Sequence, residues 1–225
     1  MPGQISFLDK IFDYIQGFEQ QLPELSNGIS PLLPYHQQKV MQLAKLFYTK
    51  FYSTNHSRSL ILGINPGRLG AGSTGIPFTD AKRLQDQCGI PNQLTSYEPS
   101  SVFIYKVIES YGGPELFYSD YFISSISPIG FIKNGKNYNY YDDKKLEDQL
   151  EPYIIFQLER LMKLDIQKVK VICLGEGKNF QFLSKLNKTG QWFEEIVPLP
   201  HPRFIVQYKS KEMYKYIDQY IQALK

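Results

Sequence analysis

Apolar residues recur along the chain at two different spacings, and segments of the two kinds alternate. Helical spacing predicts amphipathic helices over residues 5–21, 36–52, 101–111, 142–164, 180–186 and 211–224, and Thr79-Asp80 is the predicted start of a short helix. Short apolar runs predict buried strands over residues 60–64, 121–126, 169–174 and 195–199. This alternation favours an α/β fold in which a mostly parallel sheet lies between layers of helices.

Loops are predicted where proline, glycine and polar residues gather between these segments. Such stretches cover residues 22–34, 89–100 and 129–141, and the two prolines of residues 200–203 predict a rigid turn. The sequence shows no internal repeat and no linker composition. We therefore expect the 225 residues to form a single domain, with the helices of residues 1–52 packed on it.

A glycine-rich stretch, residues 63–78, directly follows the first predicted strand. Its five glycines and two prolines predict neither a strand nor a helix. Open α/β sheets bind ligands at loops beyond the carboxyl ends of their strands. Here Asn65 supplies an amide at the strand exit, and Phe78 supplies a flat ring behind Pro77. An amide, an aromatic face and closely approaching backbone N–H groups suit a planar heterocycle.

His201 follows the last predicted strand and is therefore expected at the same edge of the sheet as Asn65. An imidazole there is suited to stabilising negative charge that develops during a reaction. Each of these residues also has a simpler explanation. Asn-Pro commonly begins a turn, a histidine between prolines fits a surface turn, and a lone Phe78 fits the core. Their shared position at strand exits favours a functional site.

The spacing of Gly70, Gly72 and Gly75 matches the G-x-G-x-x-G pattern of dinucleotide-binding loops. In such loops the first glycine follows the strand directly and the last begins a helix. In this chain the match starts well after Ile64, and Pro77 follows where the first helical turn belongs. The sequence therefore argues against a dinucleotide site.

Composition narrows the class of protein without deciding its function. Apolar residues at 42% and charged residues at 21% are ordinary for a soluble globular protein. A net charge of +3 permits nucleic acid as a partner without requiring it, and the 17 tyrosines fit either core packing or base stacking. Two cysteines and three scattered histidines predict neither a disulfide framework nor a metal site. Without a signal or membrane-spanning pattern, we expect a cytoplasmic protein.

Residues 63–78 resemble the first motif of the uracil-DNA glycosylase superfamily, most closely its single-strand-selective monofunctional branch. That motif, G-M-N-P-G-x-x-G-x-x-x-T-G-x-P-F, is matched without a gap, and Ile64 replaces Met. The second motif, H-P-S-P-R, is matched in shortened form by His201-Pro202-Arg203. Residues 105–129 and 134–137 resemble the segments that carry the base-reading residue and the loop after it. The likeness covers about residues 60–204 and leaves out the N-terminal helices.

The resemblance implies a three-layer α/β/α fold with a short four-stranded sheet, and hydrolysis of the bond between uracil and deoxyribose in DNA. It implies no metal and no cofactor, and we expect a monomer that acts on single-stranded or mismatched DNA. The base must be extruded from a duplex or met in a single strand. The implied positions fall into three groups: Asn65 and His201 for catalysis; Ile64, Gly67, Phe78 and Ser125 for the base; Arg203, Phe204, Lys209 and Lys211 for DNA.

The resemblance also implies a role for each catalytic and base-binding residue. Asn65 positions the attacking water, and His201 with backbone N–H groups near Ile64 stabilises charge at O2 of the base. Phe78 stacks on the base, and Gly67 leaves room at C5 for 5-substituted uracils. No lysine is placed to attack the sugar, so strand cleavage is not expected.

Two departures from the family pattern affect specificity. Ser125 stands where the family has an asparagine, and a hydroxyl cannot make both contacts of an amide to the base edge. The shortened turn after His201 implies a reduced wedge and poorer action on duplex DNA. Two alternatives remain open: a modified-base-binding module of the same fold without catalysis, and a nucleotide-processing enzyme that uses the glycine loop for phosphate.

Overall fold

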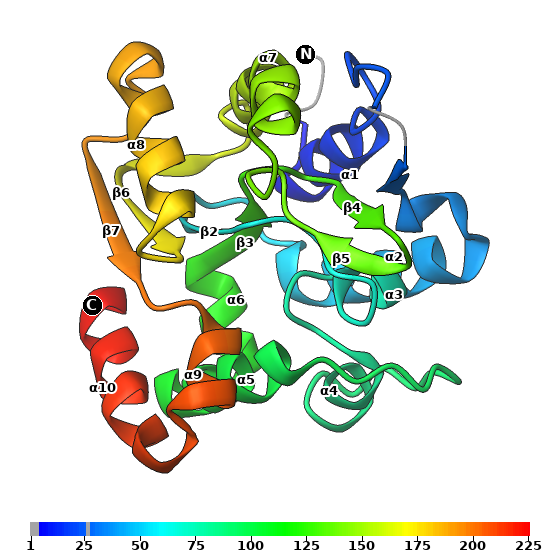
Figure 1. Cartoon of the computed structure of the whole chain (residues 1–225). Coiled ribbons are helices and arrows are strands. Elements are labelled where there is room, and N and C mark those ends of the chain that lie inside the picture. Colours follow the sequence, from blue (N-terminus) through cyan, green and yellow to red (C-terminus); the bar gives the residue numbers. More distant parts are fainter. Residues whose placement is uncertain (1–4, 26–27) are drawn as a thin grey trace.

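The computed structural model describes residues 5–25 and 28–225, and a parallel four-stranded sheet forms its centre (Figure 1). The strand order is β3-β2-β6-β7. Their bounds are Tyr121–Ser125 for β3, Arg58–Gly63 for β2, Ile166–Leu174 for β6 and Glu195–Leu199 for β7. Because all four strands are parallel and in register at their carboxyl ends, these ends share one edge of the sheet. The predicted mostly parallel sheet is confirmed.

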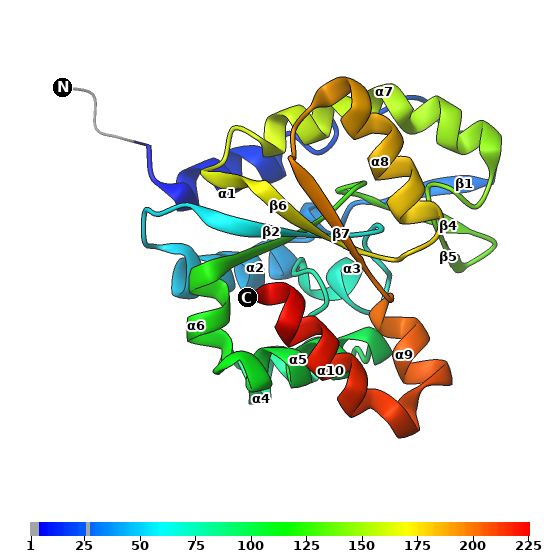
Figure 2. The same ribbon diagram turned by 90° about the vertical axis from the view of Figure 1, so that its left-hand side faces the viewer.

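Helices cover both faces of this sheet, as the perpendicular view shows (Figure 2). On one face lie α1 (Phe7–Gln16), α7 (Lys144–Leu161) and α8 (Lys178–Gly190). On the other lie α2 (Gln38–Tyr52), α5 (Pro99–Tyr111), α6 (Pro114–Asp120) and α10 (Met213–Leu224). The three-layer α/β/α architecture is therefore confirmed.

The N-terminal helices contribute to the same hydrophobic core as the sheet. Ser6 caps α1 in a capping box with Asp9, which satisfies two backbone N–H groups at the helix start. At the next residue, the fully buried ring of Phe7 packs edge-on against Phe122 of β3 and beside Tyr52 of α2. Apolar burial and aromatic packing thus join α1 and α2 to the sheet.

The prediction of a surface loop over residues 129–141 is wrong. A second, antiparallel sheet in the order β1-β4-β5 contains β1 (Ile29–Leu32), β4 (Gly130–Lys133) and β5 (Lys136–Tyr138). The turn of the β4–β5 hairpin is Asn134-Gly135, and both residues have positive φ, 49° and 71°. Asn-Gly is the dipeptide that favours such two-residue hairpin turns. β1 likewise lies inside the predicted loop of residues 22–34.

Several shorter elements also differ from prediction. The glycine-rich loop contains a helical turn, α3 (Ala71–Thr74), and the predicted rigid turn leads directly into α9 (Pro202–Tyr208). Proline is well accommodated at the first position of a helix, because its missing N–H would be unpaired there anyway. The short helix predicted to start at Thr79-Asp80 is present as α4 (Ala81–Asp86), whereas η1 (Pro34–His36), η2 (Ser210–Glu212) and α6 were not predicted.

Residues 1–4 of the predicted domain and residues 26–27 of the predicted loop lie outside the described ranges. Within the described ranges, no helix combines the length and the apolarity that crossing a bilayer requires.

Candidate active site

The glycine-rich loop leaves β2 at Gly63 and folds back on itself within a few residues. The backbone N–H groups of Gly70 and Gly72 both donate to the carbonyl of Gly67, at 3.3 and 2.8 Å. A Cβ at Gly130 of β4 would lie 2.1 Å from the carbonyl oxygen of Pro66. The loop and the β4–β5 hairpin therefore meet backbone to backbone, which only glycine permits at this point.

Phe78 is held at the end of this loop in an unusual backbone conformation. Its φ of 51° lies in the left-handed region, which bulky residues rarely adopt. Buried Thr74 secures the turn around it: its hydroxyl donates to the Thr79 carbonyl at 2.6 Å and accepts the N–H of Ile76 at 3.2 Å. Such strained residues persist only where the surrounding structure fixes them, and they cluster at functional sites.

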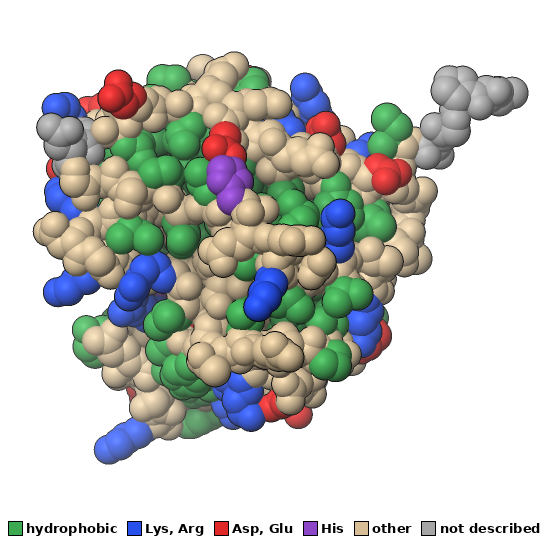
Figure 3. Space-filling model, turned by 90° about the vertical axis from the view of Figure 1, so that its right-hand side faces the viewer, with side chains coloured by type: hydrophobic (Ala, Val, Ile, Leu, Met, Phe, Trp, Pro, Cys, Tyr) green, Lys and Arg blue, Asp and Glu red, His purple; other side chains and the backbone are tan. Residues whose placement is uncertain are grey.

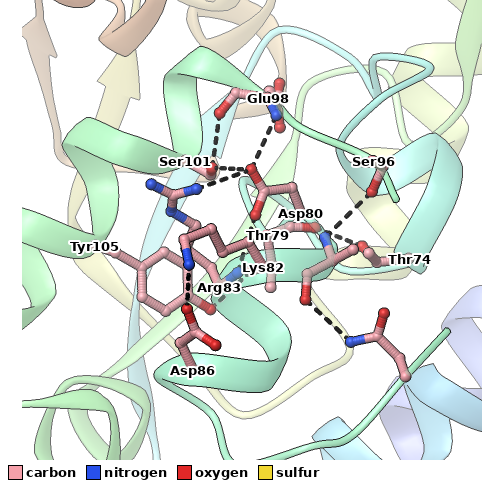
Figure 4. A network of polar contacts seen from close by, with 12 residues as sticks. Thr74, Thr79, Asp80, Lys82, Arg83, Asp86, Ser96, Glu98, Ser101 and Tyr105 are labelled. Carbon is pink, nitrogen blue, oxygen red and sulfur yellow. Dashed lines mark hydrogen bonds and ion pairs between the residues drawn. The ribbon is translucent and has the colours of Figure 1, made fainter. Parts of the chain in front are cut away.

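A second set of polar contacts fixes the chain immediately after Phe78 (Figure 4). The buried carboxylate of Asp80 caps α4 by accepting the N–H of Arg83, and it also accepts the N–H of Glu98 and the hydroxyl of Ser101. The four contacts to Asp80 include the Arg83 guanidinium at 3.4 Å. Asp80 thus ties the glycine-rich loop to the start of α5.

Ser125 ends β3 directly opposite Gly63 in the parallel register. A Cβ at Gly63 would lie 2.9 Å from the ring of Phe78 and 3.4 Å from the hydroxyl of Ser125. Gly63, Phe78 and Ser125 therefore meet at one place; two of them, Phe78 and Ser125, are predicted base-binding positions. The preceding Ser124 lies beside Tyr14 of α1.

His201 caps the start of α9, and its imidazole is the second ring, beside that of Phe78, at the point where Gly63, Phe78 and Ser125 meet. Its ring centroid lies 6.0 Å from that of Phe78, with the two planes at 50°. The Nδ1 atom accepts the backbone N–H of Arg203 at 3.2 Å, so a neutral ring carries its proton on Nε2. Burial, helped by the charge of Arg203, lowers the pKa of His201 to about 4. At neutral pH the imidazole is therefore an uncharged hydrogen-bond donor.

Asn65 lies two residues beyond β2, and the last residue of β5 and the chain just after it hold its amide from both ends. The Oδ1 atom accepts the N–H of Tyr140 at 3.2 Å, and Nδ2 donates to the carbonyl of Tyr138 at 3.3 Å. A further contact of Nδ2 reaches the Pro66 carbonyl at 3.4 Å. The orientation of the amide is thereby fixed, and one lone pair of Oδ1 remains to hold a water molecule.

The space beside Gly67 is bounded by two polar side chains. A Cβ at Gly67 would lie 3.2 Å from Nδ2 of Asn137 and 3.8 Å from Oε1 of Glu98. The Asn137 side chain also accepts the N–H of Arg68 at 3.0 Å. The resemblance implies space beside Gly67 for a substituent at C5 of the base. In the structure, the side chains of Asn137 and Glu98 limit this space.

Glu98 is a functional candidate that the sequence did not single out. Its Oε2 atom is buried and has no hydrogen-bond partner among the residues that the structure describes, and it lies against Gly70. Burial and the neighbouring Asp80 raise its pKa to about 7, against the opposing charge of Arg203. A lone glutamate in a polar loop gives no sequence signal that it becomes buried.

A cavity of about 30 Å³ lies behind Ser124 and Ser125, room for roughly two water molecules. Tyr14, Tyr35 and Tyr48 from the N-terminal part of the chain line its far side. The hydroxyl of Tyr35 also donates to the carbonyl of Gly75 in the glycine-rich loop. The N-terminal helices, from which the sequence alone gave no functional expectation, therefore reach the back of the candidate site.

The four positions predicted to contact DNA lie on α9 and just beyond it. Arg203, Phe204 and Lys211 are exposed, and Lys209 is half-buried. Phe204 is 44% exposed, and its ring centroid lies 5.5 Å from that of Tyr208, which is 65% exposed. On the face shown in Figure 3, by comparison, lysine and arginine side chains are scattered rather than gathered in one patch.

The geometry of this edge can be compared with known proteins. The uracil DNA glycosylase superfamily matches residues 49–225. The chain belongs to this superfamily. Among solved structures, wild-type SMUG2 of Pedobacter heparinus is similar, with a TM-score of 0.92 and 46% sequence identity over 98% of this chain and 97% of that one. None of the curated proteins is similar enough in sequence to match.

Membership of the uracil DNA glycosylase superfamily confirms the resemblance that the two motifs indicate. It makes the chain a DNA glycosylase, a hydrolase whose substrate is DNA. The similarity to SMUG2 extends over 98% of the chain, so it includes the N-terminal helices that the superfamily match leaves out. Those helices are therefore shared with a relative, contrary to their unfamiliar appearance in the sequence.

Proposed function

We propose that this glycosylase hydrolyses the N-glycosidic bond of uracil in DNA, that it accepts related deaminated or 5-substituted bases, and that it leaves an abasic site without cutting the strand. The observation that carries the proposal is the convergence of Phe78, His201 and Ser125 at one edge of the sheet. An aromatic face, a neutral donor and a hydroxyl suit a flat base whose edge carries carbonyl oxygens.

The leaving base is the first half of the proposed mechanism. As the glycosidic bond stretches, the sugar becomes oxocarbenium-like and the base takes up negative charge. Neutral His201 donates its Nε2 proton toward O2 of the base, because Nδ1 is occupied by the N–H of Arg203. A donor that stays uncharged stabilises this charge without giving up its proton, and losing one such donor typically costs about 10²–10³-fold in rate.

The attacking water is the second half. Asn65 holds it through Oδ1, while the backbone of Tyr138 and Tyr140 keeps the amide from turning. An amide is not a base, so it orients the water rather than deprotonating it. The rate therefore depends on positioning and on stabilisation of the departing base.

Recognition of DNA involves a different surface. Arg203, Lys209 and Lys211 are suited to phosphate contacts, and Phe204 to the gap left by the extruded base. We propose that single strands and mismatched pairs are better substrates than a paired duplex, because the turn after His201 is short. The protein is proposed to act as a monomer.

The test is base release from oligonucleotides that carry one uracil, either single-stranded or paired with G or A. After alkali treatment we expect strand cuts at the uracil with the wild-type protein, and none without alkali. Asn65→Ala and His201→Ala should each slow release by about 10²-fold or more. Wild-type rates in both variants would overturn the assigned roles.

A further inference from the structure

The loop that holds Asn65 is itself anchored from inside the protein. Tyr140, whose backbone N–H binds Asn65, is fully buried, and its hydroxyl donates to Oδ1 of Asn179 at 2.9 Å. Its ring packs against Tyr141 and Phe182, with centroids 4.9 and 4.8 Å away. The position of the Tyr140 backbone therefore depends on where Asn179 lies.

Asn179, in the first turn of α8, is 1% exposed and binds two strand ends at once. Its Nδ2 atom donates to the carbonyl of Leu174 at 3.0 Å and lies 3.5 Å from the carbonyl of Gly63. These are the last residues of β6 and β2. A series of hydrogen bonds therefore connects Gly63 to Asn65, two residues later in the chain, through Asn179 and Tyr140.

The turn between β6 and α8 is shaped for this contact. Gly175 has φ of 121°, a conformation that side chains rarely allow, and a Cβ there would lie 3.2 Å from the Cβ of Asn179. The same glycine donates its N–H to the carbonyl of Leu199 at 2.7 Å, two residues before His201. One buried turn thus supports both strand exits that carry Asn65 and His201.

We propose that Asn179, acting through Tyr140, is a positioning residue that sets the orientation of the Asn65 amide. This inference rests on the proposed function of Asn65 in holding the attacking water. Asn179 touches no substrate; through the Tyr140 hydroxyl it fixes the residue whose backbone N–H binds Oδ1 of Asn65. A small shift of the Tyr140 backbone turns the Asn65 amide and misplaces the water, so the effect falls on the chemical step rather than on DNA binding.

Tyr140→Phe is the main test, because it removes one hydroxyl and keeps the ring. We expect the single-turnover rate of uracil release to fall about tenfold, the equivalent of one buried hydrogen bond, with unchanged affinity for DNA. In an Asn65→Ala background the same change should cost nothing further, because the residue it positions is gone. Tyr141→Phe, which removes a neighbouring hydroxyl, is the matched control and should keep the wild-type rate.

A second measurement does not depend on activity. The side-chain amide resonance of Asn65, identified by its loss in Asn65→Ala, should shift and exchange faster with solvent in Tyr140→Phe and in Asn179→Leu, but not in Tyr141→Phe. An unchanged Asn65 resonance, or a rate loss that persists in the Asn65→Ala background, would overturn the inference. If the wild type released no base at all, the proposed function would fail while the resonance still reported on the coupling.

Discussion

The ring of Phe78 lies so close to Gly63, the last residue of β2, that any side chain at this position would collide with it. A Cβ at Gly63 would lie 2.9 Å from Cζ of Phe78, inside the distance that real Cβ atoms keep. The ring cannot retreat easily, because Phe78 is 9% exposed and its backbone is held in the left-handed region. The glycine that ends β2 therefore determines where the stacking face lies.

Replacing Gly63 by alanine should displace the stacking ring. We expect Gly63→Ala to lower kcat/KM for uracil release by about tenfold or more, because the base loses its aromatic contact. Gly177→Ala is the matched control, since a Cβ at Gly177 has no atom within 4 Å. Steady-state kinetics on a single-stranded substrate measures both; equal rates in the two variants would contradict the role of Gly63.

The pH profile should show that His201 acts in its neutral form. Burial holds the pKa of His201 near 4, below its ordinary value, so the ring stays uncharged from neutral pH down to about pH 5. We expect kcat/KM, which reports on the free enzyme, to fall only as pH approaches 4. A fall with a midpoint near 6.5 would contradict this reading.

The same shift affects folding stability. Between about pH 4 and 6.5 the unfolded chain binds a proton at His201 that the folded chain does not. The contribution of His201 to folding stability therefore falls as pH drops through this window. His201→Asn serves as the control, since it should remove both this stability change and the inflection in activity.

Much of the fold could be predicted from the sequence because its signals are local. The four parallel strands are short apolar runs, and the long helices show helical spacing. The β4–β5 hairpin was missed although Asn134-Gly135 carries a recognised turn signal, because the flanking residues are polar and aromatic rather than alternating. The helix α9 is not predicted because the two prolines of residues 200–203 are typical of a rigid turn, whereas Pro202 occupies the first position of a helix.

The candidate site was predictable only where one motif carries it. Asn65 and Phe78 lie in a single glycine-rich stretch, and His201 follows a strand. The groups that hold them come from elsewhere in the chain: backbone atoms of Tyr138 and Tyr140, and the buried side chain of Asn179. Backbone contacts between distant segments leave no trace in residue type, so only the structure reveals them.

Ser125 should determine which base the enzyme prefers. A hydroxyl makes one directed contact to the base edge, whereas an amide offers a donor and an acceptor together. We expect Ser125→Asn to raise the preference for uracil over deaminated purines by about tenfold, with the cavity behind Ser125 giving room for the larger side chain. Competition assays that count released bases measure this preference. Ser124→Ala, which removes the neighbouring hydroxyl beside Tyr14, should leave this preference unchanged.

The aromatic pair on α9 should contribute to single-strand binding. Phe204 and Tyr208 are exposed beside each other, three and seven residues after His201. Stacking on an aromatic side chain is typically worth about 1–3 kcal/mol per base, so Phe204→Ala or Tyr208→Ala should weaken single-strand affinity by about tenfold. Fluorescence anisotropy measures this. Tyr214→Ala is the control, because Tyr214 is 61% exposed but lies on α10; an equal loss there would indicate non-specific stacking.

Glu98 should make the protein less stable as pH rises. Its pKa is raised to about 7 by burial and by Asp80, so the folded chain keeps the proton that the unfolded chain loses above about pH 4.5. The contribution of Glu98 to the free energy of unfolding should therefore decrease from about pH 4.5 to 7 and then level off. Glu98→Gln cannot ionise, so its stability relative to the wild type should increase across this window.

Urea denaturation at several pH values measures this difference in stability between Glu98→Gln and the wild type, with Glu109→Gln, an exposed position of α5, as control. A constant difference between Glu98→Gln and the wild type would show that the carboxyl is already ionised in the folded protein.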